Sequence, residues 1–303
     1  MLWQRLLFGA ILIAVLVGLL YADSRLAAWV SQDAAEFRFD GAILTGTVAV
    51  LVFLGGLEIT RLFRGAGHQP LTLWPSIVSS LIASIPFLCK SGLTGNWGLA
   101  KLSPAQLTVG ALLTALFGVF FLVALRRRTD RAIGDMAVSI WPVLYLGLLP
   151  QFIVSIRLDG SPHGIAIVLF FIATVKICDI GAYFTGRAIG RHKLIIWLSP
   201  KKTWEGLCGG VVASIVLAVG VAKWIDGSQA AAFPPAFLTV GRAAIFGFLM
   251  AVIGQTGDLL ESLIKRDAQA KDSAQAIPAF GGVLDILDSV LLTAPVAWWI
   301  LIH

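Results

Sequence analysis

Nine apolar runs, each near the length that crosses a lipid bilayer, constrain this chain more than any other feature of its sequence. A transmembrane helix needs about 20 mostly apolar residues, because the hydrocarbon core is about 30 Å thick. Of the 303 residues, 58% are hydrophobic and only 13% are charged, whereas a soluble protein of this length needs a more polar surface. The runs are Leu6–Tyr21, Ala42–Thr60, Leu71–Cys89, Ala105–Leu125, Ala137–Val154, Ile165–Phe184, Leu207–Val221, Ala243–Leu260 and Val283–Ile302. We therefore predict an all-α fold, a polytopic integral membrane helical bundle of about nine transmembrane helices, with kinks or breaks at Pro75, Pro86, Pro142 and Pro150.

The lysines and arginines are unevenly distributed between the loops on the two sides of these spans. With a cytoplasmic N-terminus, 15 of the 23 lie on the cytoplasmic side, as the positive-inside rule requires. We treat the first run as a span, because Leu20-Tyr21-Ala22 does not form a clean signal-peptide cleavage site. We expect a protein of the bacterial inner membrane whose active site, in the charged stretch 257–288, faces the cytoplasm.

Polar residues of specific type and spacing are concentrated in the second part of the chain. The first part has Glu58 and Arg61, which are three residues apart and are expected to form a structural pair. We predict an N-terminal transmembrane scaffold over residues 1–130 and a C-terminal transmembrane catalytic region over residues 131–303. The three cysteines are far apart and form no C-x-x-C motif, which argues against a disulfide framework or a structural zinc site.

The stretch 257–288 places ionisable groups beside apolar runs, where such groups are costly and usually functional. Asp258, Glu261, Ser262 and Lys265 follow the spacing i, i+3, i+4, i+7, so they share one stripe of a helix. The small residues just before them would let another group approach closely. The alternative is a solvated ladder in which Lys265 only pairs with the carboxylates.

Two further carboxylates, Asp285 and Asp288, are three residues apart at the start of the last run, after Gly281-Gly282. Their mutual repulsion is relieved if a cation lies between them, and Mg²⁺ is typically held by one or two carboxylates together with substrate phosphates. The sequence therefore predicts a divalent metal site near a helix N-terminus, which also suits phosphate. Lys265-Arg266 and Lys271-Asp272 lie between the acidic groups, either as a clamp on a polyphosphate or as a basic loop that faces anionic lipid.

A third group of polar residues lies between the sixth and seventh runs. Asp179 is inside the sixth run, and glycines follow it at positions 181, 186 and 190. The segment Ser199-Pro200-Lys201-Lys202-Thr203 offers hydroxyls, backbone N–H groups and two ammonium groups, which together suit a phosphate. It lacks the G-x-x-x-x-G-K-[ST] spacing of a P-loop.

Together these blocks resemble the phosphatidate cytidylyltransferase family, also called the CDP-diglyceride synthases. The family pattern reads S-x-x-K-R, four residues, K-D, and then G-G-h-x-D-R-h-D, where h is apolar. It matches this chain at Ser262, Lys265, Arg266, Lys271, Asp272, Gly281, Gly282, Asp285 and Asp288. The segments Asp179–Leu194 and Ser199–Gly206 are also similar, and Tyr145-Leu146-Gly147 and Arg157 more loosely, so the resemblance covers about residues 140–303. Two positions depart from the pattern: Phe280, where the family often has His, and Ile286, where it has Arg.

The resemblance implies transfer of CMP from CTP to phosphatidic acid, which gives CDP-diacylglycerol and pyrophosphate. It implies a catalytic set of Asp258, Lys265, Arg266, Asp285 and Asp288, in which the three aspartates hold Mg²⁺ and a second cation is left open. The substrate-binding residues that it implies are Asp179, Ser199, Lys201, Lys202, Thr203, Glu261, Ser262, Lys271, Asp272, Gly281 and Gly282. The expected partners are CTP, phosphatidic acid and membrane lipids, without nucleic acid, and small-residue faces such as Gly209-Gly210 leave a homodimer open.

Two other functions are compatible with the residues alone. A polyprenol kinase is another membrane enzyme that uses CTP, and it would release CDP rather than pyrophosphate. A secondary transporter would use Asp179, Lys176 and Asp258 as sites for its coupling ion. Transporters usually show two related halves, and we find no such repeat.

Overall fold

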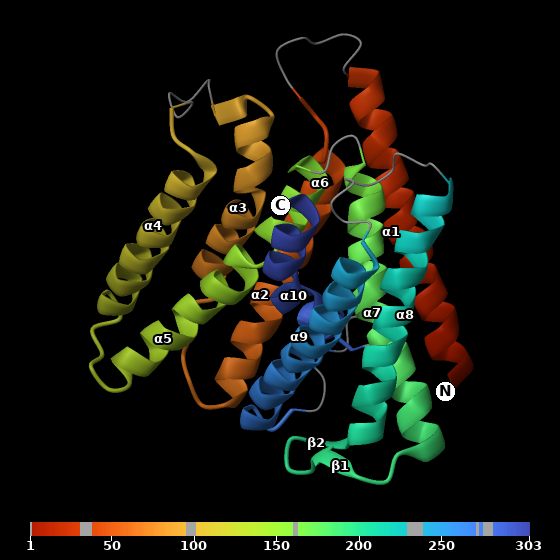
Figure 1. Cartoon of the computed structure of the whole chain (residues 1–303). Coiled ribbons are helices and arrows are strands. Elements are labelled where there is room, and N and C mark those ends of the chain that lie inside the picture. The colour runs from red at the N-terminus through yellow and green to blue at the C-terminus, as the bar shows by residue number, and fades with distance from the viewer. Residues whose placement is uncertain are drawn as a thin grey trace. The chain divides into compact units, whose positions relative to one another are not determined.

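The computed structural model of the chain describes residues 2–30, 38–94, 101–159, 163–228, 239–270, 273–274 and 281–303. These residues are almost entirely helical (Figure 1). The elements are α1 (Leu2–Val30), α2 (Ala42–Gly65), α3 (Leu73–Lys90), α4 (Pro104–Ala124), α5 (Ala132–Pro142), the π-helix η2 (Val143–Leu148), α6 (Gln151–Asp159), α7 (Gly164–Ile189), β1 (Lys193–Ile195), β2 (Ser199–Thr203), α8 (Trp204–Ser228), α9 (Val240–Asp267) and α10 (Leu284–Ile302).

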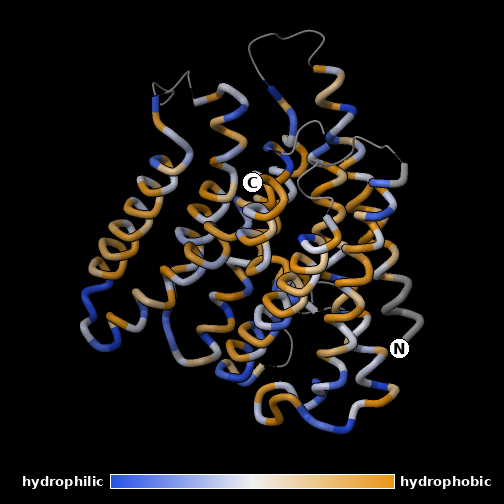
Figure 2. Tube along the Cα trace, in the orientation of Figure 1, coloured by the Kyte–Doolittle hydropathy of each residue, from blue (hydrophilic) through white to orange (hydrophobic). Residues whose placement is uncertain are grey.

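Within the described ranges, nine helical stretches are long and apolar enough to cross a membrane. Figure 2 shows apolar residues along these helices and polar residues mainly at their ends and in the connecting loops. The predicted all-α, polytopic membrane fold is therefore confirmed. One of the nine spans, Ala132–Asp159, consists of α5, η2 and α6. Its change from α- to π-helix follows Pro142, where the sequence predicts a disturbance, whereas α3 continues through Pro86 without a break.

The chain forms two compact units, and each contains residues from two separate segments. The first unit contains residues 1–158 and 267–285, and the second contains residues 159–266 and 286–303. The predicted border between a scaffold and a catalytic region, at residues 130 and 131, stays a prediction.

A buried ion pair joins distant parts of the first unit. Asp23 of α1 is 0% exposed and Arg157 of α6 is 4% exposed, and the Arg157 Nε donates to the Asp23 Oδ2 over 2.9 Å. The same carboxylate accepts hydrogen bonds from the backbone N–H groups of Gly41 and Ile43, at 3.2 and 2.9 Å. These are donors at the start of α2 that would otherwise lack a partner within the helix. Asp23 therefore holds α1, α2 and α6 together.

We expect Asp23→Asn to destabilise the protein by about 3–5 kcal/mol, because it leaves the Arg157 guanidinium buried without its counter-charge. The measurement is thermal unfolding of the purified protein in detergent micelles. Asp130→Asn, at an exposed position, is the control and should change the stability by less than about 0.5 kcal/mol. Equal unfolding midpoints for Asp23→Asn and the wild type would contradict this role.

In the second unit, α7 and α8 lie side by side (Figure 1), and small residues line their contact. A Cβ added to Gly181 would lie 2.7 Å from the Cβ of Ala213, and one added to Gly210 would lie 2.8 Å from the Cys178 carbonyl oxygen. Gly209 likewise faces the side chain of Thr185. The small-residue face considered for a homodimer is therefore occupied by α7 of the same chain.

A short antiparallel hairpin, β1–β2, connects α7 to α8 (Figure 1). Its strands pair Lys193 with Thr203 and Ile195 with Ser199. The sequence predicts phosphate-binding groups in this segment but no strands. Because successive residues of a strand point to opposite faces, β2 directs Lys201 and Lys202 to opposite sides of the hairpin.

Candidate active site

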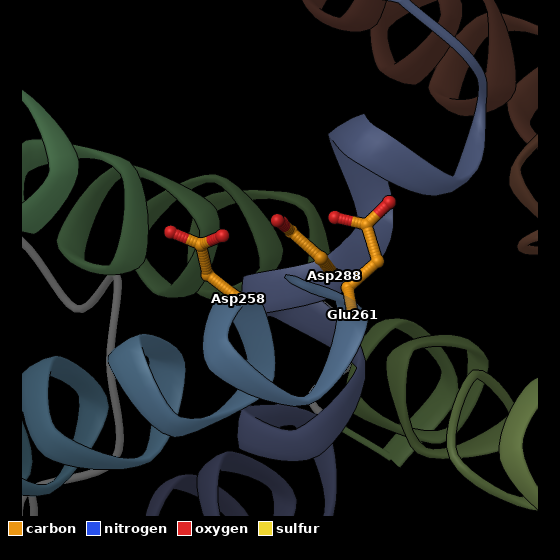
Figure 3. Close-up of side chains that lie close together, drawn as sticks. All are labelled: Asp258, Glu261 and Asp288. Carbon is orange, nitrogen blue, oxygen red and sulfur yellow. The ribbon is translucent and has the colours of Figure 1, made fainter. Parts of the chain in front are cut away.

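Three carboxylates from two helices converge in the second unit. Asp258 and Glu261 lie one turn apart on α9, and Asp288 lies on α10. One oxygen of each carboxylate lies within 4.8 Å of the other two. Figure 3 shows the Asp288 side chain between those of Asp258 and Glu261, with all three carboxylates on the same side of α9. We call these three residues the carboxylate cluster.

The cluster forms because α9 and α10 approach each other closely at two glycines. A Cβ added to Gly257 would collide with the carbonyl oxygen of Asp288. A Cβ added to Gly254, one turn earlier, would lie 3.6 Å from the carbonyl oxygen of Ser289. The small residues before Asp258 therefore allow close approach of another group, as the sequence indicates, and that group is the backbone of α10.

Each carboxylate of the cluster faces a lysine from a different element. Lys202 Nζ of β2 lies 2.6 Å from Asp258 Oδ2, and Lys265 Nζ of α9 lies 2.9 Å from Glu261 Oε2. Lys176 Nζ of α7 lies 4.0 Å from Asp288 Oδ1. Glu261 is 1% exposed, so its pair with Lys265 is not the solvated ladder that the sequence left open.

Lys176 belongs to this site, although the sequence suggests it only as a coupling-ion residue of a transporter and not as part of the catalytic set. Its Nζ donates to the Ile286 carbonyl oxygen at 3.0 Å and to Ser289 Oγ at 2.8 Å, and lies 3.7 Å from Asp179 Oδ2. Gln255 Nε2 donates to the other oxygen of Asp179 at 3.2 Å. A lysine one turn before an aspartate inside an apolar run is the signal that could have identified it.

Asp285 lies in the first unit and has a different set of partners. Its Oδ2 accepts hydrogen bonds from Gly282 N at 2.7 Å, Ser273 Oγ at 2.7 Å and Ser273 N at 3.1 Å. These bonds close the turn that leads into α10. In the same turn Gly281 has a φ of +105°, which favours glycine. The predicted roles of Asp285 in metal binding and of Gly281 and Gly282 in substrate binding stay predictions.

Glu58 is a second residue whose role sequence reasoning missed. Its expected partner is Arg61, but its carboxylate accepts hydrogen bonds from Val283 N and Leu284 N, both at 2.9 Å, and from Ser273 Oγ at 3.2 Å. Val283 and Leu284 begin α10, so Glu58 of α2 caps that helix from a distant point in the sequence. No local sequence pattern signals a contact across more than 200 residues.

The remaining predicted site residues lie on the hairpin and near the end of α9. Thr203 Oγ1 accepts from Gly206 N at 3.1 Å and so caps α8. Arg266 Nε donates to the Leu198 carbonyl oxygen at 3.3 Å. The others are Ser199, which is half-buried on β2, Lys201, which is exposed, and Ser262, which is half-buried on α9. Lys271, Asp272 and Phe280 lie outside the described residues.

The cluster fits a hard divalent cation such as Mg²⁺, because it offers carboxylate oxygens from three residues at short mutual distances. The four carboxylates of the second-unit site (the cluster and Asp179) exceed its three lysines by one charge. A divalent cation reverses that balance and makes the site attractive to phosphates. The arrangement is therefore suited to holding a metal ion and polyphosphate together.

Comparison with known proteins agrees with this chemistry. A model of the cytidylyltransferase family matches residues 3–303. The chain belongs to this family. Among its relatives is a phosphatidate cytidylyltransferase of Chlamydia pneumoniae, 31% identical, with 99% of this chain and 92% of the relative covered. Proteins of the same name are 30% identical in Bacillus subtilis (86% and 96% covered) and 28% identical in a Synechocystis strain (86% and 89% covered). The family resemblance that the sequence motifs indicate for about residues 140–303 is thus confirmed, and the family model extends it to residues 3–303.

We expect Asp288→Asn and Glu261→Gln to weaken binding of a divalent ion by at least about tenfold, since loss of even an outer partner has that effect at metal sites. The measurement is Mn²⁺ binding to purified protein by electron paramagnetic resonance, with Mg²⁺ as competitor. The control is Asp267→Asn, an exposed acid at the end of α9. Unchanged Mn²⁺ affinity in both cluster variants would exclude the cluster as the metal site.

We expect Glu58→Gln to weaken the start of α10 by about 1–3 kcal/mol, because buried N–H groups lose a charged acceptor. Hydrogen exchange at the amides of Val283 and Leu284 should become faster, which mass spectrometry can measure. Arg61→Ala separates the two possible roles of Glu58. If these amides exchange no faster in Glu58→Gln than in the wild type, Glu58 does not cap α10. If Arg61→Ala speeds their exchange as much as Glu58→Gln does, the Glu58–Arg61 pair is the relevant contact instead.

Proposed function

We propose that the protein is a phosphatidate cytidylyltransferase, which transfers CMP from CTP to phosphatidic acid and forms CDP-diacylglycerol and pyrophosphate. The observation that carries this proposal is the carboxylate cluster within two apolar helices, with a lysine at each of its carboxylates. Membership of the cytidylyltransferase family and the names of the relatives support the same reaction.

The reaction joins two anions, so positioning and electrostatics make up most of the catalysis. A phosphate oxygen of the lipid attacks the α-phosphorus of CTP and forms a new P–O bond. The bond from that phosphorus to the oxygen that bridges to the β-phosphate breaks, and pyrophosphate leaves with the electron pair. The lipid phosphate is already anionic near neutral pH, so no side chain needs to remove a proton from it.

The residues divide this work by charge. Asp258, Asp288 and Glu261 would hold Mg²⁺, and Asp285 is retained as a predicted ligand. When bound, that ion would withdraw negative charge from the phosphate oxygens. Lys202 and Lys265, whose ammonium groups contact Asp258 and Glu261, would neutralise phosphates of CTP and the leaving pyrophosphate. Lys176, fixed by Ile286 and Ser289, would keep the Asp288 carboxylate in place.

In this proposal the site faces the cytoplasm of a bacterium, where CTP is available. The excess of Lys and Arg on that side of the predicted spans supports this orientation. The hydroxyls of Ser199, Thr203 and Ser262 and the cations Arg266, Lys201 and Lys271 complete the proposed substrate-binding set. We propose Asp179, bonded to Gln255, as a second carboxylate that fixes Lys176.

The experiment that tests the reaction uses purified protein, phosphatidic acid and CTP labelled at the α-phosphate. We expect labelled CDP-diacylglycerol and one pyrophosphate per turnover with Mg²⁺, and neither product with EDTA. A polyprenol kinase would instead release CDP and leave the label in the nucleotide. Release of CDP without labelled lipid would therefore contradict the proposal.

We expect Asp258→Asn to lower kcat by at least about a hundredfold, because it removes a carboxylate that would hold the metal ion opposite the reacting phosphates. Asp285→Asn, at the other predicted metal ligand, should have a similar effect. The matched control is Asp267→Asn on the same helix as Asp258, which should turn over at the wild-type rate. Folding is checked by the unfolding midpoint in detergent. Wild-type turnover in Asp258→Asn would remove the basis of the assignment.

A further inference from the structure

The hairpin between α7 and α8 has an exposed apolar tip. Ile196 and Trp197 form the connection between β1 and β2, and they expose 69% and 73% of their surfaces. We call these two residues the hairpin tip. Their neighbour Leu198, in the same connection, is buried. Apolar residues gathered at an exposed end usually mark a contact with a partner or a membrane.

The base of the hairpin is fixed to the second unit, so the tip has a defined position. Lys202 of β2 forms its ion pair with Asp258, and Arg266 donates to the Leu198 carbonyl oxygen. Both partners belong to α9, about two helical turns apart. The strands also pair with each other, and Trp204 N donates to the His192 carbonyl oxygen at 3.0 Å. The tip therefore projects from a docked base.

The surface beside the tip is cationic. Arg191, Lys193 and Lys201 are all exposed. The acid of this segment, Glu205, is taken up by His192: the His192 backbone N donates to Glu205 Oε1 at 3.2 Å, and the His192 ring Nδ1 lies 2.6 Å from the same oxygen. An apolar tip flanked by three exposed cations is complementary to the boundary of a bilayer that contains anionic lipid.

The position of the hairpin in the chain points to the same partner. It leaves α7 at Ile189 and enters α8 at Trp204, and both helices are long and apolar enough to span a membrane. A segment of this length between two spans must lie at a membrane surface. Trp is enriched at that depth, where its ring meets the headgroups.

We propose that the β1–β2 hairpin is a membrane-interface wedge. The hairpin tip inserts at the boundary between headgroups and acyl chains, and Arg191, Lys193 and Lys201 bind the phosphates of anionic lipids. The insertion stands independently of the reaction, and its consequence for catalysis rests on the proposed function.

That consequence follows from the alternation of side chains along β2. Neighbouring residues of a strand point to opposite faces, so Lys201 is exposed whereas Lys202 reaches Asp258 in the carboxylate cluster. Anionic lipid that binds the exposed Lys201 is then held by the neighbour in the chain of Lys202, which belongs to the site. The wedge supplies the phosphate-bearing lipid substrate to the cluster.

The first test measures the depth of the tip with a fluorophore. The Trp197→Cys variant is labelled in a background with Cys208→Ser, which removes an exposed native thiol, and the unsubstituted background gives the residual labelling. The protein is placed in vesicles of phosphatidylcholine with phosphatidic acid. The control is Thr129→Cys, which is exposed in a strongly polar loop.

We expect the label at position 197 to be quenched by lipids that carry a nitroxide near the headgroup and to be protected from aqueous iodide. Quenching should be stronger when the nitroxide is carried by phosphatidic acid than when it is carried by phosphatidylcholine, because the cations enrich the anionic lipid by up to about fivefold each. Lys193→Gln should reduce this difference in quenching. Quenching by iodide, as at position 129, would overturn the proposal. Protection from both quenchers would also overturn it, since it would indicate a protein partner or a second copy of the chain.

The second test separates lipid capture from chemistry. With long-chain phosphatidic acid in vesicles, the double variant Ile196→Ser, Trp197→Ser should raise the KM for lipid about tenfold and leave the KM for CTP unchanged. The matched control is Trp224→Ser, which alters an equally exposed tryptophan, 68%, near the other end of α8. An unchanged KM for lipid would contradict the role in supply. Lack of turnover by the wild type would contradict the proposed function alone, because the quenching test needs no catalysis.

Discussion

The pairing of each cluster carboxylate with a lysine is the interaction on which the second unit depends. Asp258, Glu261 and Asp288 are half-buried or buried within the apolar helices α9 and α10, and a buried carboxylate without a counter-charge strongly destabilises a protein. The three lysines come from α7, β2 and α9. Satisfying the carboxylates therefore fixes the relative positions of these elements and of α10, and the site and the local fold share the same contacts.

Close backbone approach makes this pairing possible. Side chains as short as those of Asp258 and Asp288 can converge only if their helices nearly touch, and glycine at 257 permits that. The same device recurs between α7 and α8, where Gly181 and Gly210 bring together the helix that carries Lys176 and the helix that follows Lys202. Without a hydrophobic driving force between helices in lipid, such small-residue contacts supply much of the packing. The glycines of this region thus set the geometry of the charged groups.

The sequence predicts the parts of this structure that follow from local periodicity. The spans emerge because the length of an apolar run is itself a physical requirement, and the stripe of Asp258, Glu261 and Lys265 emerges because spacing defines a helix face. Contacts between distant segments are not encoded in this way. Glu58 shows the difference: local spacing favours Arg61, whereas the start of α10 offers two buried N–H groups in need of an acceptor. The stripe also does not reveal that Asp288 of α10 lies beside Asp258 and Glu261, and the predicted role of Glu261 in substrate binding stays a prediction.

The strands β1 and β2 illustrate a second limit and its consequence. Their residues include Pro200 and three lysines, a composition that does not favour strands. The pairing is stabilised from outside, by α9 through Asp258 and Arg266. Once formed, however, the strand period separates two adjacent lysines that look equivalent in the sequence. Lys202 becomes part of an anion-balancing network, and Lys201 becomes part of a surface that faces away from it. The tertiary contact of one residue thus decides the chemistry that is available to its neighbour.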